Sequence, residues 1–137
     1  MRNARQWLPV ILGLVFAVLG SAAAAPKDLC VTDGPNTFVF RRVEQLKPGG
    51  AISVQGIWRA NTRVLPFHGG AVMASDGTVR LGLFVHSTAD GGSNDFTLSG
   101  ETDTLFAGPL SFDNDGDFKP NDTLTLESVD CATVTIP

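Results

Sequence analysis

Apolar and polar residues alternate most clearly between Ala71 and His86, where the chain reads AVMASDGTVRLGLFVH. Alternation with a period of two is typical of a β-strand with one buried face and argues against an amphipathic helix. Asp76-Gly77 interrupts the alternation, and Asp-Gly is a preferred pair for the tight turn of a β-hairpin. The stretch therefore predicts two antiparallel strands joined by a two-residue turn.

The position of this turn predicts which residues of the hairpin share a face. A two-residue loop pairs Ala74 with Val79, so that the numbers of paired residues add up to 153. One face of the second strand is apolar and is predicted to lie in the core: Val79, Leu81, Leu83 and Val85. The other face is mixed and is predicted to meet solvent, a barrel lumen or an interface: Arg80, Gly82, Phe84 and His86.

Similar strand-like stretches recur at intervals of about 10–16 residues along the chain, with turn residues between them. Residues 26–35 read as an entry segment, with a turn at Asp33-Gly34-Pro35, that leads into the first strand. Residues 64–74 contain Pro66 and Gly69-Gly70, which predict a strand that starts late, bulges or lies at an edge. The pattern predicts an all-β, single-domain antiparallel β-sandwich or small β-barrel of about seven strands.

The first 25 residues have the three-part pattern of a secretory signal peptide. Arg2 and Arg5 precede an apolar run, Trp7–Gly20, and small residues follow at positions 21–25. The run is short for a membrane span, which takes about 20 residues, although an uncleaved anchor is the alternative. We expect cleavage after Ala25, which leaves residues 26–137 as one exported domain, periplasmic or extracellular, with no membrane span.

Two cysteines, Cys30 and Cys131, lie near opposite ends of the expected mature domain. An even number of cysteines in an exported protein indicates a disulfide, and two cysteines allow only one pairing. A disulfide requires Cα atoms within about 7 Å. The first and last ordered segments are therefore predicted to be neighbours.

The charge of the mature domain narrows the choice of partners. Without Arg2 and Arg5, eight Lys and Arg residues remain against 14 Asp and Glu. Ten of these acidic residues follow position 80, together with a single basic residue. Nucleic acid is therefore not an expected partner, because phosphate binding needs clustered Lys and Arg. A protein or a small-molecule ligand remains open.

The densest acidic segment, residues 113–122, resembles an EF-hand calcium loop when Gly116 takes the sixth position. The residues at ligand positions would be Ser111, Asp113, Asp115, Asp117 and Asp122. Ser111 replaces the leading Asp of that motif, Asp122 replaces its Glu, and the flanks read as strands instead of helices. A solvated turn at Asp115-Gly116 is the alternative. Calcium is the only cofactor that the sequence suggests.

The two histidines, His68 and His86, fall on the two strands of the hairpin. In the register that adds up to 153, their rings lie on opposite faces. A one-residue bulge at Gly69-Gly70 would change the sum to 152 and bring both rings to one face, where a shared metal or acid–base site is one hypothesis. The candidate binding face comprises His68, Arg80, Phe84 and His86.

No convincing catalytic set stands out in the sequence, which lacks a G-x-S-x-G motif and commits both cysteines to a disulfide. We therefore interpret the chain as an exported β-domain that acts as a non-enzymatic binding or interaction module. One alternative is a small hydrolase or isomerase that uses His68 or His86 with Asp or Glu. The other is a calcium-stabilised structural domain.

Overall fold

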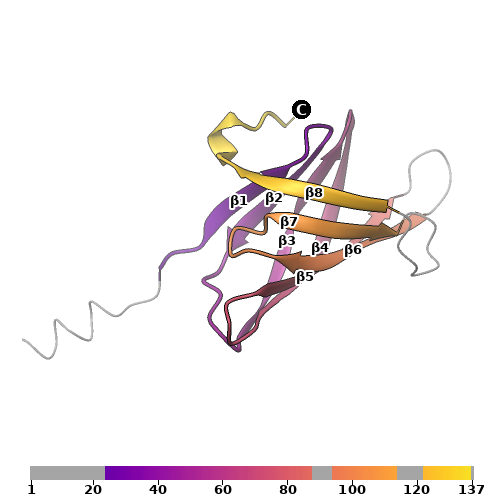
Figure 1. The fold of residues 1–137 in the computed structure, drawn as a ribbon. Helices are drawn as coiled ribbons and strands as arrows, with labels where there is room; N and C mark the ends of the chain where they lie inside the picture. Colours follow the sequence, from indigo (N-terminus) through magenta and orange to yellow (C-terminus); the bar gives the residue numbers. More distant parts are fainter. Residues whose placement is uncertain (1–23, 88–93, 114–121, 137) are drawn as a thin grey trace, which may run out of the picture.

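The computed structural model describes residues 24–87, 94–113 and 122–136 of the 137-residue chain. Eight antiparallel strands follow one another around a closed barrel in the order of the sequence (Figure 1). They are β1 (Lys27–Thr32), β2 (Asn36–Val43), β3 (Ala51–Ala60), β4 (Arg63–Met73), β5 (Val79–Ser87), β6 (Asn94–Thr102), β7 (Gly108–Asp113) and β8 (Asp122–Val129). A short 3₁₀ helix, η2 (Cys131–Thr133), follows β8. The predicted all-β fold is confirmed, and of the two predicted architectures the barrel is formed.

The eighth strand is β1, and its residues lie in the segment that is predicted only to lead into the first strand. β1 pairs with β2 on one side and with β8 on the other, and it thereby closes the barrel. The prediction of about seven strands missed it because Lys27 and Asp28 open the segment and leave only a short alternation behind them. Its strand character comes from its two neighbours more than from its own sequence.

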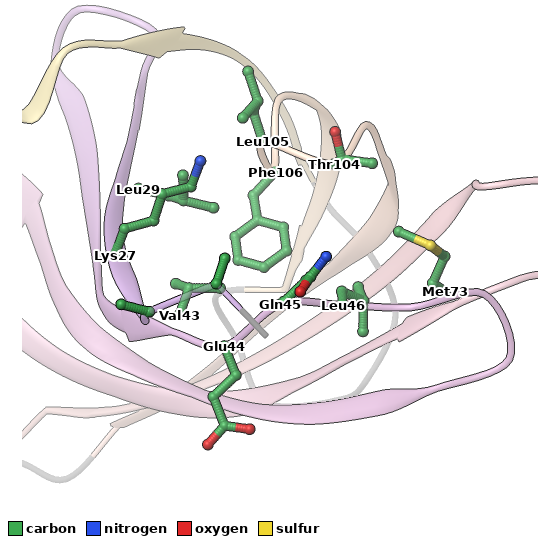
Figure 2. Close-up of a pocket in the computed structure, with 12 residues that line it drawn as sticks. Lys27, Leu29, Val43, Glu44, Gln45, Leu46, Met73, Thr104, Leu105 and Phe106 are labelled. Carbon is green, nitrogen blue, oxygen red and sulfur yellow. The ribbon is translucent and has the colours of Figure 1, made fainter. Parts of the chain in front are cut away.

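Aromatic rings fill much of the barrel interior. An eight-stranded barrel is just wide enough to be filled by side chains or to hold one small ligand. The rings contact one another along a column, with centroids of successive pairs 4.7–6.0 Å apart, that comprises Phe106, Phe40, Phe67, Phe38, Trp58, Phe112 and Phe96. Phe106 comes from the turn between β6 and β7, and its ring points into one end of the barrel (Figure 2). The interior is therefore a packed core.

The hairpin of β4 and β5 has the predicted strands but a different turn. Met73 pairs with Val79, so the numbers of paired residues add up to 152 along the whole ladder. The N–H of Gly77 donates to the Ala74 carbonyl (3.0 Å), and the N–H of Ala74 donates to the Thr78 carbonyl (2.8 Å). Gly77 has a φ of 89°. These features define a three-residue turn with a bulge, so the predicted two-residue turn is wrong.

Asp76 shows why Asp-Gly suits this longer turn as well. Its carboxylate accepts the backbone N–H of Thr78 at 2.9 Å. This hydrogen bond lowers the pKa of Asp76 below its usual value because it stabilises the ionised carboxylate. The predicted core face is unaffected by the change of turn, and its members are buried as expected: Val79, Leu81, Leu83 and Val85.

The predicted interruptions of β4 do not break its pairing with β3, which continues through Pro66 and Gly69-Gly70. The ladder between β4 and β5 begins at Phe67, directly after Pro66. A proline is tolerated at this place, where the β5 ladder has not yet begun. The alternative register was therefore right in its sum but wrong in its cause, because the turn and not a bulge at Gly69-Gly70 produces it.

Candidate functional site

The outer surface of the barrel differs sharply between its two sides. The C-terminal segment, residues 130–136, lies over the outer surface of β1–β3 around Cys30, Thr37 and Arg59, and we call this part of the surface the covered wall. Thr37 and Val39 point away from the core cluster, yet only 2% and 3% of their surfaces are exposed. The surface around them is therefore already occupied by the chain itself.

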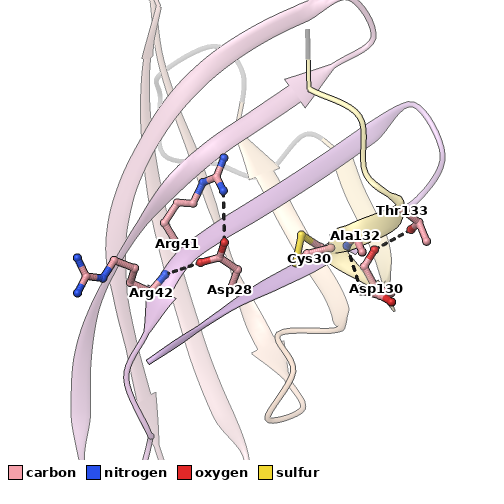
Figure 3. The surroundings of a disulfide bond; sticks show 8 residues. Asp28, Cys30, Arg41, Arg42, Asp130, Ala132 and Thr133 are labelled. Atoms are coloured by element: carbon pink, nitrogen blue, oxygen red, sulfur yellow. Dashed lines mark hydrogen bonds and ion pairs between the residues drawn. A yellow bond between two sulfur atoms is a disulfide. The ribbon is translucent and has the colours of Figure 1, made fainter. Parts of the chain in front are cut away.

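A disulfide holds the C-terminal segment on the covered wall (Figure 3). Cys30 and Cys131 are joined as predicted, with Cα atoms 5.3 Å apart and a sequence separation of 101. Asp130 shapes the chain at this point, because its carboxylate accepts the N–H of Ala132 at 3.0 Å and caps η2. Cys30 and Val129 are partners in the ladder of β1 and β8, which confirms that the first and last strands are neighbours.

Arg59 ties the end of the segment to the same wall. Its guanidinium donates to the Thr135 carbonyl at 2.6 Å and to the Thr37 hydroxyl at 3.0 Å. Thr37 also shares a hydrogen bond with the hydroxyl of Thr32 at 3.0 Å. The buried hydroxyl of Thr37 is thus satisfied, as a buried polar group must be if burial is not to cost stability.

On β4–β6 the outward side chains are accessible, and we call this side the open face. Its members with apolar, ionisable or charged side chains are His68, Val72, Arg80, Phe84, His86, Asp95 and Glu101. Phe84 is 52% exposed and Val72 is 50% exposed. The ring of His68 stacks on that of Phe84, with centroids 6.0 Å apart and an interplanar angle of 19°.

The structure brings the four residues of the predicted binding face together on the open face. His68 pairs directly with Phe84 across the ladder of β4 and β5. Arg80 and His86 lie on the same side of β5 as Phe84, because strand side chains alternate. The three-residue turn decides this arrangement, since a change of one residue in register moves His68 to the other face.

Two carboxylates complete the open face, and sequence reasoning did not place them there. Asp95 pairs with His86 across β5 and β6, and its Oδ1 lies 2.6 Å from the His86 Nδ1. Glu101 pairs with Arg80, with 3.4 Å between the guanidinium and the carboxylate. Only the register of β5 with β6 could have revealed these partners. Among the residues that the structure describes, no group of three or more His, Cys, Asp or Glu side chains is arranged to hold a metal ion.

A row of small residues crosses the outer surface of five neighbouring strands through successive ladder pairs: Ser53, Gly70, Gly82, Ser99 and Ser111. On β4–β6 this row separates the stacked pair His68 and Phe84 from Val72 and Arg80. A Cβ atom at Gly82 would meet nothing within 4 Å, so the space above this strand is open. A hollow of about 250 Å³ lies beside Arg80, Ser99 and Glu101. The open face is therefore a shallow trough between raised side chains.

The predicted calcium loop lies mostly outside the described residues, including Asp115 and Asp117. Its two ends are described. Asp113 is buried at the end of β7, whereas Asp122 is exposed at the start of β8 and its carboxylate accepts the N–H of Thr123 at 2.7 Å. Calcium binding by this segment stays a prediction.

Comparison of the chain with protein-family models, with curated proteins and with solved structures found no significant match. No helix in the described ranges is long and apolar enough to span a membrane.

Proposed function

We propose that the mature chain is an exported, non-enzymatic binding module that holds a partner protein on its open face. The observation that carries this proposal is Phe84, whose ring is half-exposed although the barrel already has a filled core. Water contact with a large apolar ring is unfavourable, and exposed apolar side chains rimmed by polar groups are typical of interaction sites. A partner that covers Phe84 would gain the free energy of burying it.

The surroundings of Phe84 suit a protein surface. Val72 offers a second apolar contact of similar exposure. Arg80 and Glu101 supply one charge of each sign at the rim, which favours a partner with complementary charges. The row of small residues lets a partner's backbone approach the strands closely. Export is supported by the N-terminal pattern of residues 1–25 and by the disulfide, which is typical of oxidising compartments.

Site-specific crosslinking in the source cells tests this proposal. A photoreactive benzoyl-phenylalanine replaces Val72 on the open face or, as a control, the exposed Thr125 on β8. We expect a discrete protein adduct from position 72, none from position 125, and loss of the first adduct when Phe84→Ser is added. Equal adducts from both positions, or an adduct that persists in the Phe84→Ser chain, would contradict the proposal.

An acid–base enzyme is the second candidate, and the short contact of His86 with Asp95 is the observation that favours it. A carboxylate that accepts a hydrogen bond from the N–H of one ring nitrogen orients a histidine for proton transfer at the other. Under this alternative, His86→Asn abolishes turnover of a hydrolysable or isomerisable substrate while the crosslink from position 72 is retained. Under the binding proposal, the adduct depends on Phe84 and no turnover is found in either chain.

A further inference from the structure

A hollow of about 290 Å³ lies at the end of the barrel where β1 begins (Figure 2). The start of β1, the segment that follows β2 and the turn between β6 and β7 enclose it. Much of its lining is apolar and comprises Leu29, Val43, Leu46, Met73, Leu105 and Phe106. Concave sites with apolar walls and a few polar groups are the usual places for small ligands.

The floor of the hollow is the ring of Phe106, which the backbone holds in an unusual conformation. Phe106 has a φ of 64°, in the left-handed region that bulky residues avoid. Gly77 occupies the equivalent position in the β4–β5 turn, where the same two backbone hydrogen bonds occur. A glycine would therefore suit position 106 without strain. Burial of the Phe106 ring against Phe40 compensates for this strain and fixes the inner wall of the hollow.

Neighbouring groups keep this ring in place. The Asp103 carboxylate accepts the N–H groups of Leu105 at 2.8 Å and of Ala107 at 3.0 Å, which fixes the turn. The Phe106 ring packs 4.7 Å from that of Phe40, centroid to centroid, and only 1% of the residue is exposed. The hollow therefore has a rigid apolar floor, and a ligand would find it already formed.

The charged groups at the rim favour an anion. Lys27 and Glu44 are the two charged residues of the lining. In Figure 2 the side chain of Lys27 runs beside Leu29 toward the side of Leu105, whereas the carboxylate of Glu44 points away from the Phe106 ring. No described residue forms a hydrogen bond or an ion pair with the Lys27 ammonium group. Lys27 is thus available for a ligand.

We propose that this hollow binds a small amphipathic carboxylate, with its apolar chain against the accessible side chains of Leu29, Leu46 and Leu105 and its carboxylate on Lys27. If each heavy atom takes up the volume of one water molecule, roughly 30 Å³, the hollow has room for about ten heavy atoms. Octanoate matches this size and carries one charge. An ammonium–carboxylate contact at the rim would orient it, and burial of its chain would supply most of the affinity.

Removal of the predicted signal peptide would improve the site. Ala24 and Ala25 line the hollow, and both precede the expected cleavage point. Cleavage after Ala25 takes these two residues away and leaves the α-amino group of Pro26 next to Lys27 in the chain. A second positive charge then stands near the rim. The volume of about 290 Å³ includes the walls that Ala24 and Ala25 provide, so the hollow of the mature chain is wider and octanoate marks the lower end of the ligand sizes it should accept.

Calorimetry with octanoate and with octanol, its uncharged counterpart, tests the proposal on protein purified from the export compartment. Mass spectrometry first establishes its N-terminus. Lys27→Gln should weaken octanoate binding about tenfold, the loss expected for one charge-assisted hydrogen bond, and should leave octanol binding unchanged. Lys47→Gln is the matched control. Lys47 is exposed and directly follows the residues of the β2–β3 connection that line the hollow, but it does not line the hollow itself.

Three results would overturn the assignment: no saturable octanoate binding, equal losses from Lys27→Gln and Lys47→Gln, or equal losses for octanoate and octanol. Chemical shifts of the Met73 methyl group give a second measurement, since this residue lines the hollow and should respond to both probes. Phe84→Ser should leave octanoate binding unchanged. A failure of the octanoate proposal is therefore distinguishable from a failure of the proposal that the open face binds a partner protein.

Discussion

The covered wall and the open face are made from the same kind of alternating strands, but only one of them is covered by the chain. On the covered wall, the outward Thr37 and Val39 are almost fully buried. On the open face, the outward Val72 and Phe84 are half-exposed. The difference comes from the C-terminal segment, which the disulfide and Arg59 hold on one side of the barrel. Among the described residues, the two most exposed large apolar side chains therefore lie on the open face, whereas Leu105 is exposed at the barrel end and Val64 at the start of β4.

Removing the disulfide should have the largest effect on stability and on the difference between the covered wall and the open face. In the double variant Cys30→Ser/Cys131→Ser, the unfolded chain is no longer constrained across a separation of 101 residues. The chain-entropy model predicts a loss of about 4–5 kcal/mol in the free energy of unfolding for a loop of this length. Urea denaturation measures the loss. Hydrogen exchange should also accelerate in β1 and β2 before it does in β5, and uniform acceleration would argue against a covered wall.

Two glycines on neighbouring strands, Gly69 on β4 and Gly82 on β5, allow the inner and the outer side of the sheet to be compared. A Cβ at Gly69 would run into the Gly82 carbonyl, whereas a Cβ at Gly82 would meet nothing within 4 Å. We expect Gly69→Ala to lower the free energy of unfolding by about 2–3 kcal/mol through overpacking. Gly82→Ala should be neutral or stabilising by up to about 1 kcal/mol, because alanine loses less backbone entropy on folding. Equal losses in urea denaturation would show that the open face is packed like the core.

Two arginines allow a matched test of the two sides. Arg59→Ala removes the hydrogen bonds to Thr135 and Thr37 and should cost about 1–2 kcal/mol in thermal or urea unfolding. Arg80→Ala removes only an ion pair between exposed side chains, and its effect should stay below about 0.5 kcal/mol. A larger loss from Arg80→Ala would mean that the open face stabilises the fold in its own right.

The smallest expected effect on stability is that of Phe84→Ser. Half of the ring already meets water, so its removal should cost about 1 kcal/mol or less. The inward-facing Phe67 on β4 is the control. Phe67→Ser removes one ring from the aromatic column and leaves a cavity, which should lower the free energy of unfolding by at least about 3 kcal/mol. Similar losses for the two variants in urea denaturation would assign Phe84 a structural role and remove the main support for the binding proposal.

Much of the candidate face could be predicted from one strand. The alternation of β5 placed Arg80, Phe84 and His86 on one side without any knowledge of their neighbours. His68 could not be assigned in the same way, because Asp76-Gly77 suits both a two-residue and a three-residue turn. Asp95 lies far enough along the chain that only the ladder between β5 and β6 identifies it as the partner of His86. The hollow at the barrel end was not predictable, since its lining comes from four separate segments.

The sequence by itself determined the all-β character, the apolar face of β5 and the single disulfide pairing. These properties depend on the alternation within one strand or on the number of cysteines, and both can be read locally. Only the tertiary structure decided that the sheet closes into a barrel, that β1 is its eighth strand and that the hairpin register adds up to 152. It also decided which outer surface the C-terminal segment covers. These outcomes depend on contacts between segments distant in the chain, whose energies no single stretch of sequence contains.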